Sequence, residues 1–411
     1  MAGRKPRDEY RKIDDKRRRT GFEEVYVGFT EEEAQEEASR CLNCRVPMCR
    51  KGCPANVDIP GFIQLILQKK YKEAYDLIRS FNYAPAVCSR CCPQEKQCEG
   101  NCVLGKKLQP VHIGALERFV ADQVFKNHRE DRITAKTDKR VAIVGCGPAG
   151  MSAAYHLLKK GIPVTVYEKE DYCGGLLYDG IPTYRLPDDI VRKLVDILKE
   201  MGAEIKNNVH VGKDITINDL REQYNAIFIA AGEAEAYSMG IEGEDLKGVY
   251  LAKPFLRQVN LWADGKIHEK PEIGDTVVVV GGGNVAMDSV RCAVRLGARK
   301  VILVYRRSEM EMPATREELE LAKDEGVEFM YLTNPKRILG RDGRVTAVEC
   351  LRMRLGEPDR SGRRRPIPVE GSEFTIDTDT VIMAIGQSPD CLLYTSPSPR
   401  DLSTSRMPSS A

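Results

Sequence analysis

The sequence predicts an α/β fold in which a helical, cysteine-rich domain is followed by two parallel-sheet domains. Two apolar segments, 141–144 and 164–167, enclose a glycine-rich turn and a helix, and the same order recurs between 276 and 305. Strands that alternate with helices in this way are typical of parallel sheets. Ahead of them, nine of the 14 cysteines lie between Cys41 and Cys102, among short amphipathic segments.

Composition limits the classes of function. The length of 411 residues predicts two or three domains, and a hydrophobic content of 42% is enough for their cores. The net charge of +2 predicts no special affinity for nucleic acid or membranes. No apolar run is long enough to span a bilayer.

Residues 1–29 form a basic arm that also carries acidic residues and has no apolar core. It is therefore not a secretory signal, and its acids argue against a transit peptide. We expect the arm to be solvated, with binding to an acidic partner surface as the alternative. We expect a cytoplasmic protein, in which a disulfide framework is improbable and metal or cluster ligation is the leading explanation for the cysteines.

The cysteines form two groups separated by helices. A helix over 31–40 leads into the first group, which is Cys41-x2-Cys44-x4-Cys49-x3-Cys53-Pro54. Helices over 60–69 and 72–80 precede the second group, which is Cys88-x2-Cys91-Cys92-Pro93-x4-Cys98-x3-Cys102, and a helix over 113–125 follows. Closely spaced cysteines that end in Cys-Pro are typical of 4Fe–4S ligation, and two clusters would give about eight irons per chain. Zinc is the main alternative, and inert thiols are the other.

The first glycine-rich turn has the sequence Gly145-Cys146-Gly147-Pro148-Ala149-Gly150, and the strand after its helix ends at Glu168. This is the dinucleotide-binding fingerprint in its strand–turn–helix–strand setting. The glycines would let the backbone approach a pyrophosphate at the helix N-terminus, and Glu168 would accept hydrogen bonds from ribose hydroxyls. A glycine-rich turn in an ordinary α/β domain is the alternative.

Two further segments point to the same site. Gly174 and Gly175 follow the acid-ended strand and would let the backbone pass close to a flat ring system. The strand over 226–230 ends in the small residues Ala231 and Gly232, as expected where the backbone abuts a cofactor. For the glycine pair, a flexible loop is the alternative.

The second glycine-rich turn is Gly281-Gly282-Gly283-Asn284-Val285-Ala286, and the strand after its helix ends in Arg306-Arg307. An acid at this position suits a ribose hydroxyl and repels a 2′-phosphate, whereas arginine binds the phosphate through charge-assisted hydrogen bonds. The first site is therefore predicted to bind FAD and the second NADPH rather than NADH. A solvated strand end is the alternative for the arginines. The strand over 380–384 closes with Ile385-Gly386 and parallels the Ala231-Gly232 strand end.

Together these segments resemble the small (β) subunit of NADPH-dependent glutamate synthase and its relatives. The relatives include the large subunit of the NADH-dependent ferredoxin:NADP oxidoreductase, sulfide dehydrogenase and the N-terminal half of dihydropyrimidine dehydrogenase. The resemblance extends over about residues 22–390. It rests on RCLNCRVPMCRKGCP, CCPQEKQCEGNCVLGKK, HIGALERFVAD, VGCGPAG, GGLLYDGIPTYRLP, VVGGGNVAMDS and YRRSEMEMPA.

The resemblance implies two 4Fe–4S clusters whose ligands interleave along the chain. One would be held by Cys41, Cys44, Cys49 and Cys102, and the other by Cys53, Cys92, Cys98 and Glu117. Cys88 would be a nearby non-ligand. Cys91 stands where the family usually has an apolar residue, so it could compete as a ligand.

The resemblance also implies an NADPH domain inserted into an FAD domain. The predicted divisions are the arm 1–29, a double-cluster domain 30–127, a linker 128–140, the first part of the FAD domain 141–252, the NADPH domain 253–388 and a tail 389–411. The cofactor-binding residues predicted from the fingerprints and the resemblance are Gly145, Gly147, Pro148, Ala149, Gly150, Glu168, Gly174, Gly175, Leu176, Arg185, Gly232, Gly281, Gly283, Asn284, Val285, Ala286, Arg306, Arg307 and Gly386.

The tail from about Cys391 is rich in Ser and Pro and has no periodicity. The family returns to the FAD domain after the position of Gly386 and supplies a Gly-Asp motif, which this tail lacks. We therefore expect the C-terminal part of the FAD domain to be missing and the tail to be an artefact of sequencing-adapter read-through. A natural disordered tail is the alternative.

The predicted function is an NADPH-dependent oxidoreductase subunit for electron input. Hydride would pass from NADPH to FAD, and single electrons would pass through the clusters to a partner, with no catalytic acid–base pair. The resemblance implies a hetero-oligomer with a glutamate synthase large subunit, which makes glutamate from 2-oxoglutarate and glutamine. One alternative is a subunit of ferredoxin:NADP oxidoreductase or sulfide dehydrogenase, with ferredoxin or an iron–sulfur flavoprotein as partner. The other is a non-catalytic metal-binding product.

Overall fold

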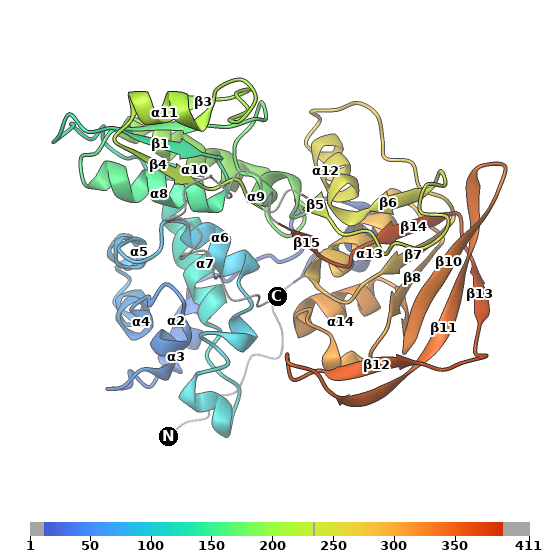
Figure 1. Ribbon diagram of the computed structural model, residues 1–411. Helices are drawn as coiled ribbons and strands as arrows, with labels where there is room; N and C mark the ends of the chain where they lie inside the picture. The colour runs from blue at the N-terminus through green and yellow to red at the C-terminus, as the bar shows by residue number, and fades with distance from the viewer. Residues whose placement is uncertain (1–11, 233–234, 389–411) are drawn as a thin grey trace. The chain divides into compact units, whose positions relative to one another are not determined.

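The computed structural model describes residues 12–232 and 235–388, which form two compact units (Figure 1). The first unit contains the N-terminal helices up to Arg129, the segment Tyr178–Leu194 and Ser238–Ile385. The second contains Glu130–Leu177, Val195–Tyr237 and the strand that follows Ile385. Within these described ranges, no helix is both long and apolar enough to cross a membrane.

The N-terminal segment packs onto the first unit. Helix α1 (Asp15–Thr20) is capped by Asp14, whose side chain accepts a hydrogen bond from the Arg17 amide at 3.0 Å. Val25 is buried, and its amide donates to the Tyr184 carbonyl at 3.0 Å. The expectation of a solvated arm is therefore wrong for the stretch that carries α1 and Val25. The part of the arm before residue 12 lies outside the described residues.

Short helices surround the cysteine loops. Helix α2 (Glu31–Ser39) opens with the capping box Thr30-x-x-Glu33, in which each side chain bonds the other residue's amide. The core of this helical region is built by Phe62, Ile66 and Leu116, all buried. The remaining helices are α3 (Met48–Gly52), α4 (Ile59–Leu67), α5 (Tyr71–Arg79), α6 (Pro85–Cys91), η1 (Gln94–Lys96), η2 (Val103–Lys106), α7 (Ile113–Val124) and η3 (Phe125–Asn127).

The second unit is built on a four-stranded parallel sheet with the order β3-β2-β1-β4. Its strands are β1 (Val141–Val144), β2 (Val164–Tyr167), β3 (Glu204–Lys206) and β4 (Ala226–Ile229). Its helices are α8 (Pro148–Lys159) and α11 (Ile217–Gln223), and a two-stranded ribbon pairs β5 (Glu235–Ala236) with β15 (Gln387–Ser388). The predicted linker 128–140 packs onto this unit, because the Lys136 amide donates a hydrogen bond to the Gly161 carbonyl at 2.8 Å. Two helices contribute residues to both units, namely α9 (Leu176–Asp179) and α10 (Asp188–Met201).

The second nucleotide fold is a five-stranded parallel sheet in the first unit, with the order β6-β14-β7-β8-β9. Its strands are β6 (Val249–Leu251), β7 (Thr276–Val280), β8 (Lys300–Tyr305), β9 (Glu328–Tyr331) and β14 (Thr380–Met383). Since β6 pairs with β14, the second nucleotide fold begins before the predicted division at 252/253. Its helices are α12 (Ala252–Ala263), α13 (Asn284–Leu296), η4 (Glu309–Glu311) and α14 (Arg316–Asp324).

Alternate residues of the central strand β7 face two different layers. Val277 and Val279 pack with the helices α12, α13 and α14. Val278 and Val280 pack against an antiparallel sheet, which lies beside the parallel one in Figure 1. That sheet consists of β10 (Thr333–Arg341), β11 (Arg344–Pro358), β12 (Arg364–Pro368) and β13 (Phe374–Asp377).

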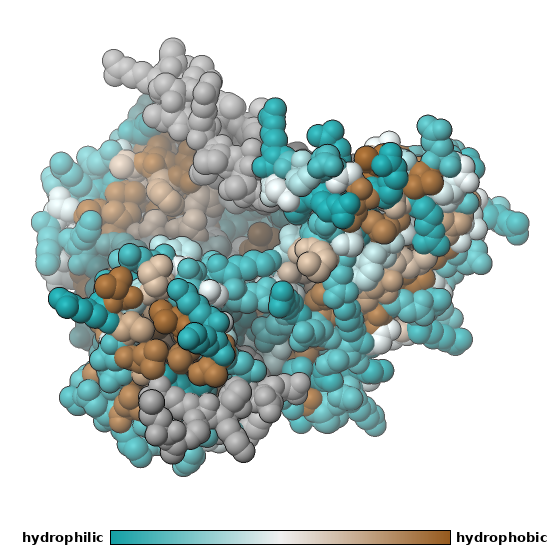
Figure 2. Space-filling model, turned by 90° about the horizontal axis from the view of Figure 1, so that it is seen from below, coloured by the Kyte–Doolittle hydropathy of each residue, from teal (hydrophilic) through white to brown (hydrophobic). Residues whose placement is uncertain are grey.

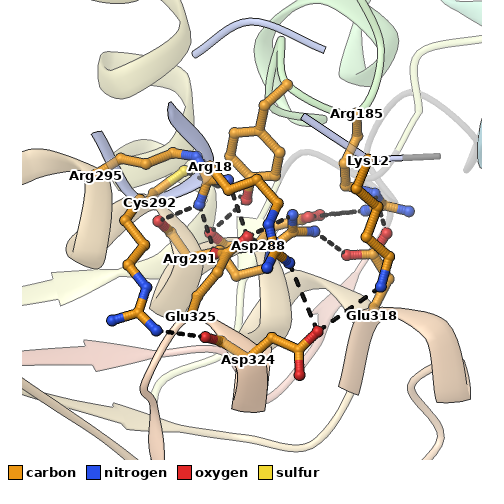
Figure 3. Close-up of polar contacts among 12 residues, drawn as sticks. Lys12, Arg18, Arg185, Asp288, Arg291, Cys292, Arg295, Glu318, Asp324 and Glu325 are labelled. Carbon is orange, nitrogen blue, oxygen red and sulfur yellow. Dashed lines mark hydrogen bonds and ion pairs between the residues drawn. The ribbon is translucent and has the colours of Figure 1, made fainter. Parts of the chain in front are cut away.

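A buried network of ion pairs lies within the first unit, where it joins the N-terminal segment to α13 and α14 (Figure 3). Arg291 and Arg295 of α13 both donate to Glu325, which follows α14. Next to it, Asp324 pairs with Arg18 of α1 at 3.6 Å. The charges of Arg295 and Glu325 are buried and paired, so the network leaves neither ion uncompensated, while the half-exposed Asp324 holds Arg18 of the segment.

Candidate cofactor sites

The first glycine turn is shaped to receive a ligand. A Cβ atom at Gly145 would lie 2.3 Å from the Ala230 carbonyl oxygen, and one at Gly150 would lie 2.0 Å from the Gly145 carbonyl oxygen. Both glycines are therefore needed for the close packing of turn, helix and β4. No neighbouring atom lies within 4 Å of the position that a Cβ would take at Gly147, and this residue caps the N-terminus of α8. The open space faces free helix amides, so it fits a pyrophosphate group.

Glu168 stabilises this turn from the end of β2. Its carboxylate accepts hydrogen bonds from the amides of Cys146 at 2.8 Å and Glu170 at 3.0 Å, and the residue is buried. Each oxygen keeps a second lone pair for a ribose hydroxyl. The structure thus adds a positioning role to the predicted one.

The Gly174–Gly175 loop lies directly against the turn. The Gly174 amide donates to the Cys146 carbonyl at 2.8 Å, and a Cβ at Gly175 would lie 3.1 Å from Gly147 Cα. Leu176 is partly exposed beside them. Gly232 has a φ of +73° and no neighbour within 4 Å of a Cβ position. The predicted residues of the first site therefore gather at the carboxyl ends of β1, β2 and β4.

The structure also contains a disulfide that the sequence analysis did not predict. Cys146, in the glycine turn, is bonded to Cys173, with their Cα atoms 5.1 Å apart. Nothing in the spacing of these cysteines marks them as a pair, because only the fold brings the two loops together. The bond links both loops of the first site.

Removing this bond should destabilise the second unit. Closing a loop of this length restricts the unfolded chain, so Cys173→Ser should lower the free energy of unfolding by roughly 3 kcal/mol. Thermal unfolding without reductant checks this, with Cys173→Ser in excess dithiothreitol as the control for other effects of the reductant. Excess dithiothreitol should lower the melting temperature of wild type to that of the variant. Equal melting of wild type and Cys173→Ser without reductant would show that the pair is not bonded.

The second glycine turn repeats the geometry of the first. A Cβ at Gly281 would lie 2.3 Å from the Ala384 carbonyl oxygen, as at Gly145 and Ala230. Gly283 caps α13, with its nearest neighbour, Pro313, 3.9 Å from the Cβ position. Asn284 accepts a hydrogen bond from the Thr315 amide at 3.0 Å. Of the other predicted residues, Val285 is partly exposed and Ala286 buried, while Gly386 belongs to the second unit.

The two predicted phosphate-binding arginines have different surroundings. Arg307 is buried, and its guanidinium donates to the Arg364 carbonyl at 2.8 Å and to Asp359 at 2.9 Å. Arg306 is exposed and makes no hydrogen bond or ion pair with any described residue. Burial of part of its side chain and the charges of Arg307 and Arg363 lower the pKa of Arg306. Arg306 is thus available to an anion, whereas Arg307 anchors the hairpin between β11 and β12.

Arg185 belongs to the first unit, where it is paired with acidic side chains. Its guanidinium bonds Asp288 at 2.7 Å and pairs with Glu318 at 2.9 Å inside the ion network shown in Figure 3. Since its donors are directed at these acids, cofactor binding by Arg185 stays a prediction. Its role in the structure is to tie the segment after α9 to α13 and α14.

The first predicted cluster site is a cavity lined by cysteine side chains. Cys41, Cys44, Cys49 and Cys102 line one cavity together with apolar residues that include Ile59 and Ile63. Burial raises the pKa of the Cys49 thiol to about 11. Because thiolates are the ligands, loading an iron–sulfur cluster here would release a proton from this residue at neutral pH. The donor set and the apolar walls fit a 4Fe–4S cluster.

The second predicted set also lies together. The contact with Cys88 and burial raise the pKa of Cys92, and the charge of Glu117 adds to the rise. Burial raises the pKa of Cys98, and the charges of Glu117 and Cys53 raise it further. The Glu117 residue is half-buried, and its carboxyl accepts a hydrogen bond from the Asn82 side-chain amide at 3.2 Å. These proximities fit the predicted ligand set.

The two remaining cysteines of this region have different neighbours. Cys88 lies one helical turn before Cys92, and its thiol contacts the Asn82 side chain at 3.6 Å. Burial raises the pKa of the Cys91 thiol, and the charges of Arg185, Cys88 and Asp288 also act on it. These charges belong both to the ion network and to Cys88 beside the second ligand set, so competition by Cys91 as a ligand stays a prediction.

Two family models match the chain. One, described as dihydropyrimidine dehydrogenase domain II, 4Fe-4S cluster, matches residues 17–129, and the other, described as pyridine nucleotide-disulphide oxidoreductase, matches residues 139–402. The chain is 40% identical over 380 residues to the glutamate synthase (NADPH) small chain of Escherichia coli K12, covering 90% of this chain and 80% of that one.

Other relatives are longer than the matched region. The chain is 42% identical over 381 residues to the putative oxidoreductase AegA of Escherichia coli K12, of which it spans 58%. It is 43% identical over 348 residues to the NADPH-Fe(3+) oxidoreductase subunit beta of Geobacter sulfurreducens, of which it spans 51%. Among solved structures, FprA of Mycobacterium tuberculosis in complex with NADPH matches with a TM-score of 0.53 and 23% identity, over 61% of this chain and 71% of FprA. That match shows the shared nucleotide-binding fold.

Proposed function

Because the chain belongs to the family of glutamate synthase small chains, with an iron–sulfur domain ahead of a pyridine nucleotide oxidoreductase region, we propose that it is the electron-input subunit of a larger oxidoreductase. It would oxidise NADPH and deliver single electrons to a partner. The observation that carries this proposal is the presence of two glycine turns of the same geometry and one four-cysteine cavity in the same chain.

The chain's own residues would bind and orient the cofactors. The amides at the start of α8, opened by Gly147, would hold the pyrophosphate of FAD, and Glu168 would fix the turn and accept from the ribose. The amides at the start of α13 would hold the pyrophosphate of NADPH, and Arg306 its 2′-phosphate. When bound, a flavin accepts two electrons together and iron–sulfur clusters carry them singly.

For the partner, we propose a glutamate synthase large subunit, so that the electrons reduce 2-oxoglutarate and glutamine-derived ammonia to glutamate. Support comes from the relative that the chain covers to 80%, which is a glutamate synthase small chain. A second candidate is an iron-reducing or other NADPH-linked complex. It is favoured by the 43% identity to the NADPH-Fe(3+) oxidoreductase subunit beta. Co-purification of a glutamate synthase large subunit would decide for the first.

Anaerobic reconstitution with iron, sulfide and FAD tests the electron-input function. We expect about eight irons per chain and bleaching of the flavin absorbance on addition of NADPH. Cys44→Ser should reduce the iron content to about four per chain, whereas the matched variant Cys91→Ser should retain about eight. Stoichiometric zinc without visible absorbance, or a flavin that NADPH leaves oxidised, would refute the proposal.

A further inference from the structure

Large apolar side chains surround the first cysteine cavity at the surface. Leu42, Met48 and Val103 line the cavity, and Val46 and Leu108 lie in the same two chain segments. These five residues, here called the cavity rim, are exposed by 37% to 60%. Figure 2 shows apolar patches bordered by hydrophilic residues on the face seen from below. Contiguous exposed apolar side chains inside a polar border mark interaction sites more often than free surface.

The rim is continuous with the cavity itself. Leu42, Met48 and Val103 are exposed and also line the cavity that Cys41 and Cys102 enter. An occupant of the cavity would therefore be separated from the surface by single side chains. Electron tunnelling falls steeply with distance, so this is the place where a partner's redox centre can come closest to that cavity.

The unpaired charges near the rim have one sign, because Asp58, which precedes the cavity-lining Ile59, is paired with Arg50 at 3.7 Å. Arg45, Lys51, Lys106 and Lys107 are exposed, and their side chains make no hydrogen bond or ion pair with any described residue. Residues 41–57 and 102–116 contain no Asp or Glu. Unpaired lysine and arginine side chains in this arrangement attract a negatively charged surface and speed its association.

We propose that the cavity rim is the docking surface for a redox protein that presents an apolar patch bordered by acidic side chains, and that electrons leave the chain there. This inference rests on the proposed electron-input function. Oxidation of one NADPH to NADP⁺ and H⁺ supplies two electrons, which reduce two molecules of a one-electron acceptor. A second copy of the chain is a poor occupant of the rim, because it would place the same unpaired cations face to face.

The test compares two one-electron acceptors of opposite charge, the acidic soluble domain of cytochrome b5 and the basic cytochrome c. The reconstituted chain is assayed with NADPH, as wild type, Lys106→Glu and the matched control Lys126→Glu, whose lysine is exposed and unpaired in the same helical region. At low ionic strength, Lys106→Glu should reduce cytochrome b5 about tenfold more slowly. The rate at which Lys106→Glu reduces cytochrome c should be unchanged or higher. Lys126→Glu should reduce both cytochromes at the wild-type rates.

Two further measurements isolate the surface. Salt should slow the reduction of cytochrome b5 by wild type and have little effect on the Lys106→Glu variant. Val46→Ser, which removes apolar surface without a charge, should raise the KM for cytochrome b5 and leave the iron content unchanged. Equal rates with cytochrome b5 for Lys106→Glu and Lys126→Glu, or an equal loss of rate with cytochrome b5 and cytochrome c in Lys106→Glu, would overturn the docking proposal. If NADPH fails to bleach the flavin, the electron-input function itself is refuted.

Discussion

Replacing Glu325 by glutamine should lower the free energy of unfolding of the first unit by about 3–5 kcal/mol. Glu325 is buried and accepts hydrogen bonds from Arg291 at 2.9 Å and from Arg295 at 2.6 Å (Figure 3). The substitution removes the negative charge that both guanidinium groups share: Arg291 keeps its pair with Glu318, but buried Arg295 keeps only carbonyl acceptors, which is more costly than losing an exposed pair. Urea denaturation monitored by circular dichroism would measure the change.

The matched control is Glu320→Gln, which makes the same change on the exposed side of α14. It should alter the free energy of unfolding by no more than about 0.5 kcal/mol. A difference between the two variants of less than about 1 kcal/mol would contradict the assignment of Glu325 as a buried charge partner, on the same scale of buried-pair energies.

The effect of Glu325→Gln should also depend on pH. Burial raises the pKa of Glu325, but the hydrogen bond from Arg295 and the charges of Arg291 and Arg295 outweigh it and hold the pKa below its ordinary value. A carboxyl whose pKa is lower in the folded state adds stability above its unfolded pKa and loses it as the pH falls through the folded pKa. The difference in free energy of unfolding between wild type and Glu325→Gln should therefore be largest at neutral pH and decrease in acid.

The nucleotide turns could be predicted from sequence because they depend on local backbone geometry. Gly145 and Gly281 both have a positive φ and leave no room for a Cβ beside the neighbouring strand, so only glycine fits. The fold class and the positions of β1, β7 and their helices follow from the same short pattern of strand, turn and helix.

Side-chain pairing across the fold could not be predicted. Arg185 and Arg307 each lie in a segment that resembles a cofactor-binding motif, yet both donate to acids, Asp288 and Asp359, that are more than 50 residues away. Which arginine stays free depends on which distant carboxylate the topology brings near. The Cys146–Cys173 disulfide was missed for the same reason.

Replacing Arg306 by glutamine should lower kcat/KM for NADPH by about 10- to 100-fold and leave kcat/KM for NADH within about twofold, because a hydrogen bond between charged groups contributes about 1.5–3 kcal/mol. Arg306 is exposed at the end of β8 and has no partner among the described residues, and the charges of Arg307 and Arg363 make its surroundings more positive. An anionic 2′-phosphate is the group that such surroundings favour. Steady-state kinetics with both nucleotides would measure the change.

Two arginines serve as comparisons for Arg306→Gln. Arg299 precedes β8 at the opposite end of the strand, with its side chain 81% exposed, so Arg299→Gln should leave both nucleotides unaffected. Arg307→Gln should have a different effect from Arg306→Gln, because Arg307 pairs with Asp359 in the hairpin and is not expected to contact the nucleotide. The loss of Arg307 should lower kcat/KM for NADPH and for NADH to a similar extent. If Arg307→Gln, and not Arg306→Gln, lowered kcat/KM for NADPH alone, the assignment of the two arginines would be reversed.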